Sequence, residues 1–209
     1  MRSRLLTRMT IVAILAGLPA IAAKCQEQSN TPSAPALQLF TGYSYANAQL
    51  GSQTGVFAPA GSSYNGYQID ATLDLRHRTG LLVDFAQQTG RSTIPDPLGH
   101  EAYMTLYDTQ LLIGPEFAMR SRKYDAFTHA LIGLTHMSLN ELKGYYVDDP
   151  DFKSLATRTS LTLGGGGGID RDWGDNLAVR LVQIDYIPNR LDGTWKASLR
   201  LSTGVIFKF

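Results

Sequence analysis

The sequence has little of what marks several common protein classes. It contains one cysteine among 209 residues, so no disulfide can form within the chain. No uninterrupted apolar run reaches the roughly 18 residues that a membrane-spanning helix needs. Charged residues make up 18% of the chain and the formal net charge is +1, which favours neither disorder nor a nucleic-acid partner. These absences exclude a disulfide-stabilised scaffold and argue against a helical membrane protein.

The first 23 residues have the pattern of a secretory signal peptide, with a basic head, a short apolar middle and small residues at the end. The residues that carry this pattern are Arg2, Arg4, Arg8, Ala20 and Ala22. The sequence therefore predicts export, cleavage of residues 1–23 and a flexible polar lead-in at 24–36. Lys24 stands where bacterial lipoproteins require a small residue, so we expect Cys25 to remain without lipid.

From residue 37 onward, apolar and polar residues alternate with a period of two. Such alternation indicates half-buried β-strands. The predicted strands are 37–45, 66–76, 81–88, 105–117, 126–138, 159–170, 176–187 and 195–209. In 176–187 the period breaks near Leu181 and Val182, and one extra residue restores it, so a β-bulge is expected there.

The connections between these strands alternate in length. Long connections at 46–65, 89–104 and 139–158 are separated by shorter ones, and 188–194 is intermediate. Since alternate connections of an up-and-down barrel lie at opposite ends, one end would carry large loops and the other tight turns, as in transmembrane barrels. The sequence predicts an all-β fold over 37–209, an eight-stranded antiparallel up-and-down transmembrane β-barrel. A soluble barrel of lipocalin type shows the same alternation and remains an alternative.

The last strand runs to the end of the chain, with Phe207 and Phe209 on its apolar face. The segment LRLSTGVIFKF resembles the C-terminal assembly signal of Gram-negative outer-membrane proteins. Together with FTGYSY, HALIGLTHMS, LGGGGGID and LAVRLVQIDY, it makes the chain similar to the OmpA-like family of small outer-membrane β-barrels. The resemblance implies a place in the bacterial outer membrane, contact with its lipid and lipopolysaccharide, and recognition of the last strand by the assembly machinery. We expect a monomer.

The polar face of the strands carries many charged residues. The predicted interior network comprises Asp70, Asp74, Asp84, Asp108, Glu116, Arg76, Arg180, Asp185 and Arg200, with Gln68, Gln88, Gln110, His129, Gln183 and Lys196 beside them. An eight-stranded barrel is only wide enough for its own side chains, and buried charges need partners. We therefore expect an ion-paired plug rather than an open pore, with Arg180 and Arg200 as its hubs.

One stretch suggests catalysis. His136 and Ser138 share a strand face, because residues i and i+2 do, and Glu141 follows as a candidate acid. The pair is similar to the His-x-Ser motif of outer-membrane lipid A deacylases, although Leu139 stands where that family has Asn. Because this departure weakens the match, the expected function is a non-enzymatic outer-membrane barrel with a structural or recognition role through its long loops. A lipid A deacylase-like hydrolase is the alternative.

The remaining motifs predict no cofactor and no metal. The five glycines at 164–168 are not followed by Gly-Lys-Ser or Gly-Lys-Thr, so we expect them to accommodate a curved strand or a large neighbour rather than a phosphate. No His/Cys cluster predicts zinc. Asp148, Asp149 and Asp151 lack the glycine and distal glutamate of a calcium loop.

Overall fold

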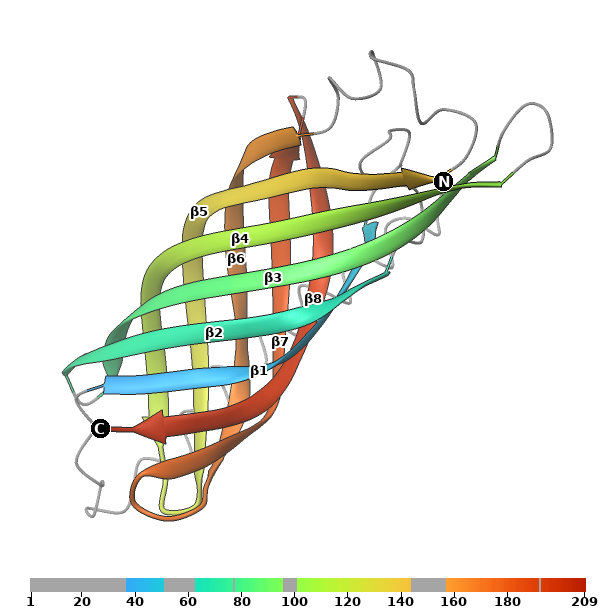
Figure 1. Ribbon diagram of the computed structural model, residues 1–209. Helices are drawn as coiled ribbons and strands as arrows, with labels where there is room; N and C mark the ends of the chain where they lie inside the picture. Colours follow the sequence, from blue (N-terminus) through green and yellow to red (C-terminus); the bar gives the residue numbers. More distant parts are fainter. Residues whose placement is uncertain (1–36, 51–62, 77, 96–100, 144–156, 192) are drawn as a thin grey trace, which may run out of the picture. The chain divides into compact units, whose positions relative to one another are not determined.

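Eight antiparallel strands form a closed barrel in strand order, which confirms the predicted fold (Figure 1). The computed structural model describes residues 37–50, 63–76, 78–95, 101–143, 157–191 and 193–209, all within one compact unit, Ser33–Phe209. The strands are β1 (Leu37–Leu50), β2 (Ser63–Arg76), β3 (Thr79–Pro95), β4 (Glu101–Arg120), β5 (Tyr124–Lys143), β6 (Thr157–Asp172), β7 (Leu177–Leu191) and β8 (Thr194–Lys208). Over these ranges no helix is long and apolar enough to cross a membrane. The predicted signal peptide and lead-in lie outside the described residues.

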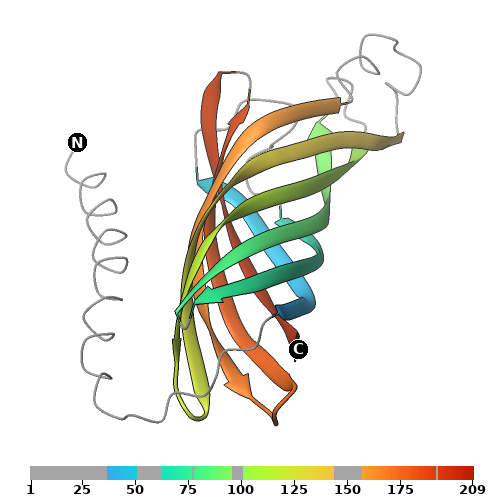
Figure 2. The ribbon, with the colours of Figure 1, turned by 90° about the vertical axis from the view of Figure 1, so that its left-hand side faces the viewer.

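The barrel closes where the two ends of the strand order meet. β1 and β8 pair along their length, beginning with Gln38 opposite Lys208 and ending with Leu50 opposite Ala197. Figure 2 shows the C-terminus beside the start of β1. The Phe209 N–H donates to the Leu37 carbonyl oxygen at 2.9 Å. The last residue is therefore paired, as a strand edge facing hydrocarbon requires.

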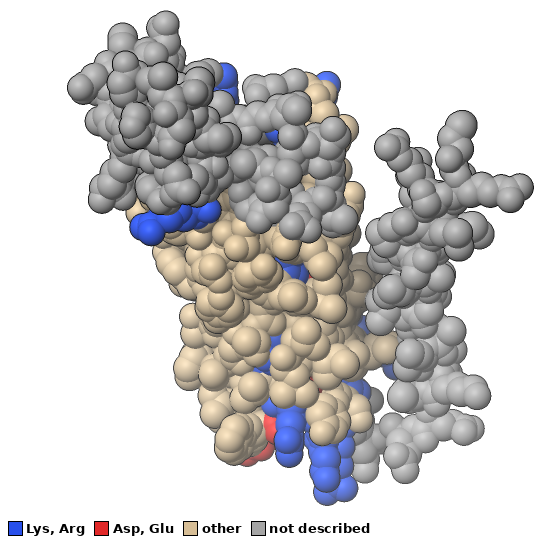
Figure 3. Space-filling view, turned by 90° about the vertical axis from the view of Figure 1, so that its right-hand side faces the viewer, with Lys and Arg blue, Asp and Glu red and all other residues tan. Residues whose placement is uncertain are grey.

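The two faces of the barrel wall differ in chemistry. Large apolar side chains are exposed on the outside of every strand. Leu201, for example, has 38% of its surface exposed. Figure 3 shows the resulting surface, mostly neutral over its middle with basic side chains gathered at the lower end. The inward side chains are mainly polar or charged. This is the reverse of a soluble ligand-binding barrel, whose apolar face must point inward, so the lipocalin-type alternative is wrong.

The strands are longer than the sequence pattern predicted, and the loops are correspondingly shorter. β3 has 17 residues and β4 has 20, so together they extend through most of the predicted loop at 89–104. β5 also has 20 residues and extends into the predicted loop at 139–158. At the same end, which we call the loop end, only two residues of the predicted connection 188–194 remain between β7 and β8. Main-chain pairing continued past the point where the apolar alternation stopped. The segments 51–62, 96–100 and 144–156 lie outside the described residues.

The opposite end, which we call the turn end, has short connections after β2, β4 and β6. Backbone hydrogen bonds join these connections to the neighbouring strands. Ala118 N–H donates to the Arg78 carbonyl at 2.9 Å, and Asp172 N–H donates to the Lys123 carbonyl at 3.2 Å. The three turns are thus held side by side along one rim.

A β-bulge in β7 sets which residues face inward. The register with β8 shifts between Arg180 and Gln183, and Leu181 and Val182 are both exposed, so the bulge lies where the broken period predicted it. Because one extra residue changes the parity of a strand, Arg180 and Gln183 can both be buried. The bulge therefore brings an arginine into the interior that strict alternation would leave outside.

The glycine run in β6 accommodates large neighbours inside the barrel. A Cβ on Gly168 would lie 2.8 Å from a ring carbon of Phe127, and one on Gly164 would lie 3.3 Å from Leu131. A Cβ on Gly165, which has the other parity, would meet nothing within 4 Å. Of the two predicted reasons for the glycines, space for a large neighbour is thus observed directly.

Candidate functional site

The centre of the barrel is held by Arg200, whose side chain is 0% exposed. Its guanidinium donates to Asp84 through Nη1 at 3.0 Å and to Asp185 through Nε at 3.0 Å and Nη2 at 2.8 Å. Nη1 also reaches Gln110 Oε1 at 3.3 Å. Since these partners come from β3, β7 and β4, one side chain on β8 connects much of the barrel wall.

A second arginine, Arg180 on β7, lies nearer the turn end. Its Nε and Nη2 donate to the two oxygens of Asp170 at 2.9 and 3.2 Å, and Nη1 donates to Asp70 Oδ2 at 3.0 Å. The guanidinium carbon lies between two rings, 4.4 Å from the centroid of Phe40 and 4.1 Å from that of Phe127. The cation is therefore neutralised by carboxylates and also sandwiched by aromatic faces.

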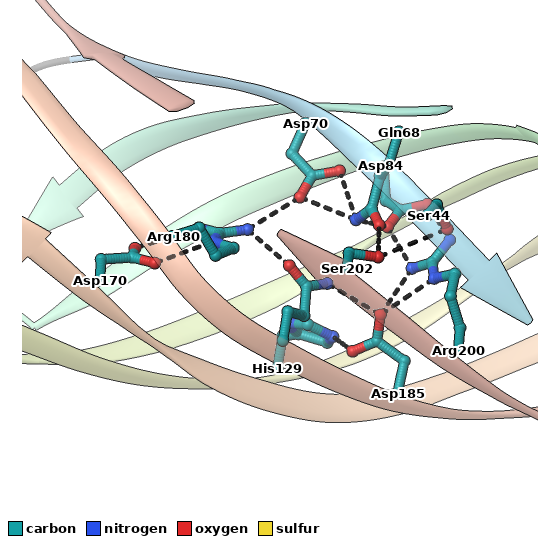
Figure 4. Close-up of polar contacts among 11 residues, drawn as sticks. Ser44, Gln68, Asp70, Asp84, His129, Asp170, Arg180, Asp185, Arg200 and Ser202 are labelled. Carbon is teal, nitrogen blue, oxygen red and sulfur yellow. Dashed lines mark hydrogen bonds and ion pairs between the residues drawn. The ribbon is translucent and has the colours of Figure 1, made fainter. Parts of the chain in front are cut away.

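Amide and hydroxyl side chains join the two arginine clusters into one network (Figure 4). Gln68 Nε2 donates to Asp70 at 2.9 Å and to Asp84 at 2.8 Å, and its Oε1 accepts from Ser202 at 2.6 Å. On the other side, His129 Nε2 lies 2.9 Å from Asp185 Oδ1. A continuous chain of charge-assisted contacts therefore runs from Asp170 to Asp185 across the interior.

Two further ion-paired groups lie at the turn end. Arg120 Nη2 reaches both oxygens of Asp74 at 2.7 and 2.8 Å. Lys208 donates to Asp125 at 3.3 Å and also to Asp172. These groups place paired charges below the central network, so ionic contacts occupy the interior from the turn end to its middle.

The other predicted interior residues are placed as follows. Asp108 is buried and accepts from Gln110 at 3.0 Å, and Glu116 is buried directly opposite His129 on the paired strand. Lys196 is half-buried near the loop end. Arg76 ends β2, but its side chain lies outside the described part of the structure. Among the described residues, no group of three His, Cys, Asp or Glu side chains is arranged to hold a metal.

The sequence pattern missed several members of the network. They are Asp170, Phe40, Phe127, Arg120, Asp125 and Asp172. Asp170 has the same parity as Gly164, Gly166 and Gly168, so extending the strand face through the glycines would have found it. Parity places Phe40 and Phe127 on the same inward face, but nothing in the local pattern indicates that an arginine lies between their rings.

The candidate catalytic residues lie on the outer face of β5, near the loop end. His136 is exposed, and its Nδ1 lies 3.0 Å from the hydroxyl of Thr159 on β6. Ser138 is half-exposed and lies opposite Tyr107 of β4 in the strand register. Glu141 lies further along β5, past a register shift, and its side chain is outside the described set. The hydrogen bond observed for the imidazole thus goes to a threonine, not to an activating acid.

We expect His136→Ala to leave lipid A acylation unchanged, because the observed imidazole contact does not orient a base toward Ser138. Mass spectrometry of lipid A from cells that produce the wild-type protein, the variant or neither would test this. Thr159→Ala is the matched control, since it removes the same hydrogen bond and keeps the histidine. Loss of an acyl chain with wild type but not with His136→Ala would contradict the prediction.

Solved structures of other proteins share this fold. The fold is that of small outer-membrane eight-stranded β-barrels, as the sequence resemblance implied. Neisserial surface protein A gives a TM-score of 0.59 at 15% identity, covering 83% of this chain and 97% of that one. OprG from Pseudomonas aeruginosa gives 0.54 at 11%, covering 84% and 96%. Ail of Yersinia pestis, in complex with the heparin analogue sucrose octasulfate, gives 0.50 at 13%, covering 83% and 99%. No family model and no curated protein sequence matches.

Proposed function

We propose that this chain is a non-enzymatic protein of the bacterial outer membrane, with a closed, ion-paired interior and a structural or recognition role at its loop end. The observation that supports this best is the pairing of an apolar outer wall with the continuous network around Arg180 and Arg200. The apolar wall suits hydrocarbon, and the network makes the interior unsuited to a wide aqueous path.

The recognition role is proposed for the connections at the loop end, 51–62, 96–100 and 144–156. A rigid barrel that presents connecting segments from one rim is a common way to support binding loops. Ail, which shares the fold, was solved with a heparin analogue, so sulfated sugars are a reasonable first class of ligand to test here. A glycan array probed with purified barrel would test this role separately from the membrane location.

The membrane location and the closed interior are tested together with full-length protein. We expect the protein in the outer-membrane fraction, with a gel mobility that changes on boiling in detergent, and no stepwise conductance in planar bilayers. Phe209→Ala should lower the amount in that fraction, since we propose that the assembly machinery recognises the last strand. A protein that stays soluble without detergent would overturn the membrane location, and regular conductance steps would overturn the closed interior.

A further inference from the structure

The turn end carries a group of exposed basic residues for which the described structure shows no ion pair. They are Arg78 in the turn after β2, Arg122 and Lys123 in the turn after β4, and Arg171 near the end of β6. We call them the basic rim. Figure 3 shows basic side chains gathered at this end of the barrel.

Most acidic residues at the turn end form ion pairs with bases outside the basic rim. Asp74 is paired with Arg120, and Asp125 and Asp172 are both bound by Lys208. Asp175 is the exposed acid of the described turns there. The basic rim is therefore a local excess of positive charge in a protein whose formal net charge is +1.

The basic rim is continuous in space and is flanked by two exposed aromatic side chains. Backbone bonds hold the turn of Arg78 against β4 and the turn of Lys123 against the end of β6. Trp173 follows directly on β6 and is 74% exposed, and Tyr124, opposite Arg171 in the β5/β6 register, is exposed too. Exposed Trp and Tyr beside Lys and Arg are typical of a protein surface at lipid head-group level.

We propose that the basic rim binds the head groups of anionic phospholipids in the leaflet at the turn end. This rests on the proposed membrane location. The phosphates would lie against bases on two turns and at the end of β6, with the tryptophan at the boundary between head groups and acyl chains. Each base near such a surface should enrich anionic lipid about fivefold, and salt should weaken the effect.

The two tryptophans allow a sharp test, because Trp173 lies at the turn end and Trp195, at the start of β8, lies at the loop end. Full-length Trp195→Phe and Trp173→Phe variants each leave one reporter. Both are reconstituted in phosphatidylcholine vesicles that contain a minor fraction of brominated phosphatidylglycerol. We expect Trp173 to be quenched well beyond the bulk fraction of the anionic lipid, and several-fold more than Trp195.

The charge variants separate the basic rim from net charge. Arg122→Gln with Lys123→Gln should lower the anionic-lipid preference at Trp173 by about fivefold for each base removed. Arg91→Gln with Arg190→Gln removes two exposed bases from the loop end and should leave the preference at Trp173 unchanged. Equal quenching at Trp173 and Trp195, with both at the bulk fraction, would overturn the proposal even if no charge variant folds.

The same experiment separates failure of this inference from failure of the membrane location. Brominated phosphatidylcholine alone should quench both tryptophans if the barrel inserts. Quenching by that lipid without a phosphatidylglycerol preference at Trp173 would reject the basic rim and leave the membrane location intact. No quenching by either lipid would reject both.

Discussion

Replacing Arg200 by methionine should lower the free energy of unfolding by about 3–5 kcal/mol. The side chain donates to Asp84 and Asp185, whose side chains are 0% and 1% exposed, so its loss leaves two carboxylates in the interior without their cation. Methionine keeps the length of the arginine stem, and the effect therefore reports charge rather than volume. Denaturant titration of the barrel in thin lipid vesicles, followed by gel mobility, measures the change.

Arg190→Met is the matched control for this substitution. Arg190 lies on the neighbouring strand β7 but is exposed, and its replacement should change stability by no more than about 0.5 kcal/mol. Adding Asp84→Asn and Asp185→Asn to Arg200→Met should recover part of the loss, since the unpaired charges are then gone. If Arg200→Met were as stable as wild type, the network would not be what holds the interior.

Adding a single methyl group to β6 should have opposite effects at adjacent positions. A Cβ on Gly166 would overlap Asp185 Oδ1 and the carbonyl oxygen of Ile184, whereas one on Gly165 would meet open space. We expect Gly166→Ala to cost about 1–3 kcal/mol through overpacking, because the displaced carboxylate also holds Arg200. Gly165→Ala should be neutral or stabilise by up to about 1 kcal/mol, since glycine weakens a strand interior.

Both glycine variants are measured by the same denaturant titration, and each is the control for the other. They differ by one position in the same strand and add the same group. A loss of stability in both would mean that the run of glycines serves strand curvature as a whole. Loss in Gly166→Ala alone would mean that the inward glycines serve the ion-paired interior.

The strand pattern alone determined the class of fold. Alternation as regular as that of residues 66–76 requires two faces of different chemistry, and a closed barrel gives eight such segments two faces and a paired edge on every strand. The broken period near Leu181 was equally readable, because a bulge is a local event that changes parity within one strand. Parity also assigned Asp84 and Arg200 to the polar face, which lies inside.

Tertiary structure decided how far the strands extend and which charges meet. β3 continues to Pro95 because backbone hydrogen bonds to β4 hold it, and these do not depend on the side-chain alternation from which the loop at 89–104 was predicted. Arg200 and Asp84 are 116 positions apart, and Arg180, which donates to Asp170, lies between the rings of Phe40 and Phe127 from two other strands. Such contacts depend on strand tilt and register around the closed barrel, which place residues from opposite walls at one level. Local pattern therefore determined the face of each residue, and closure of the barrel determined its partner.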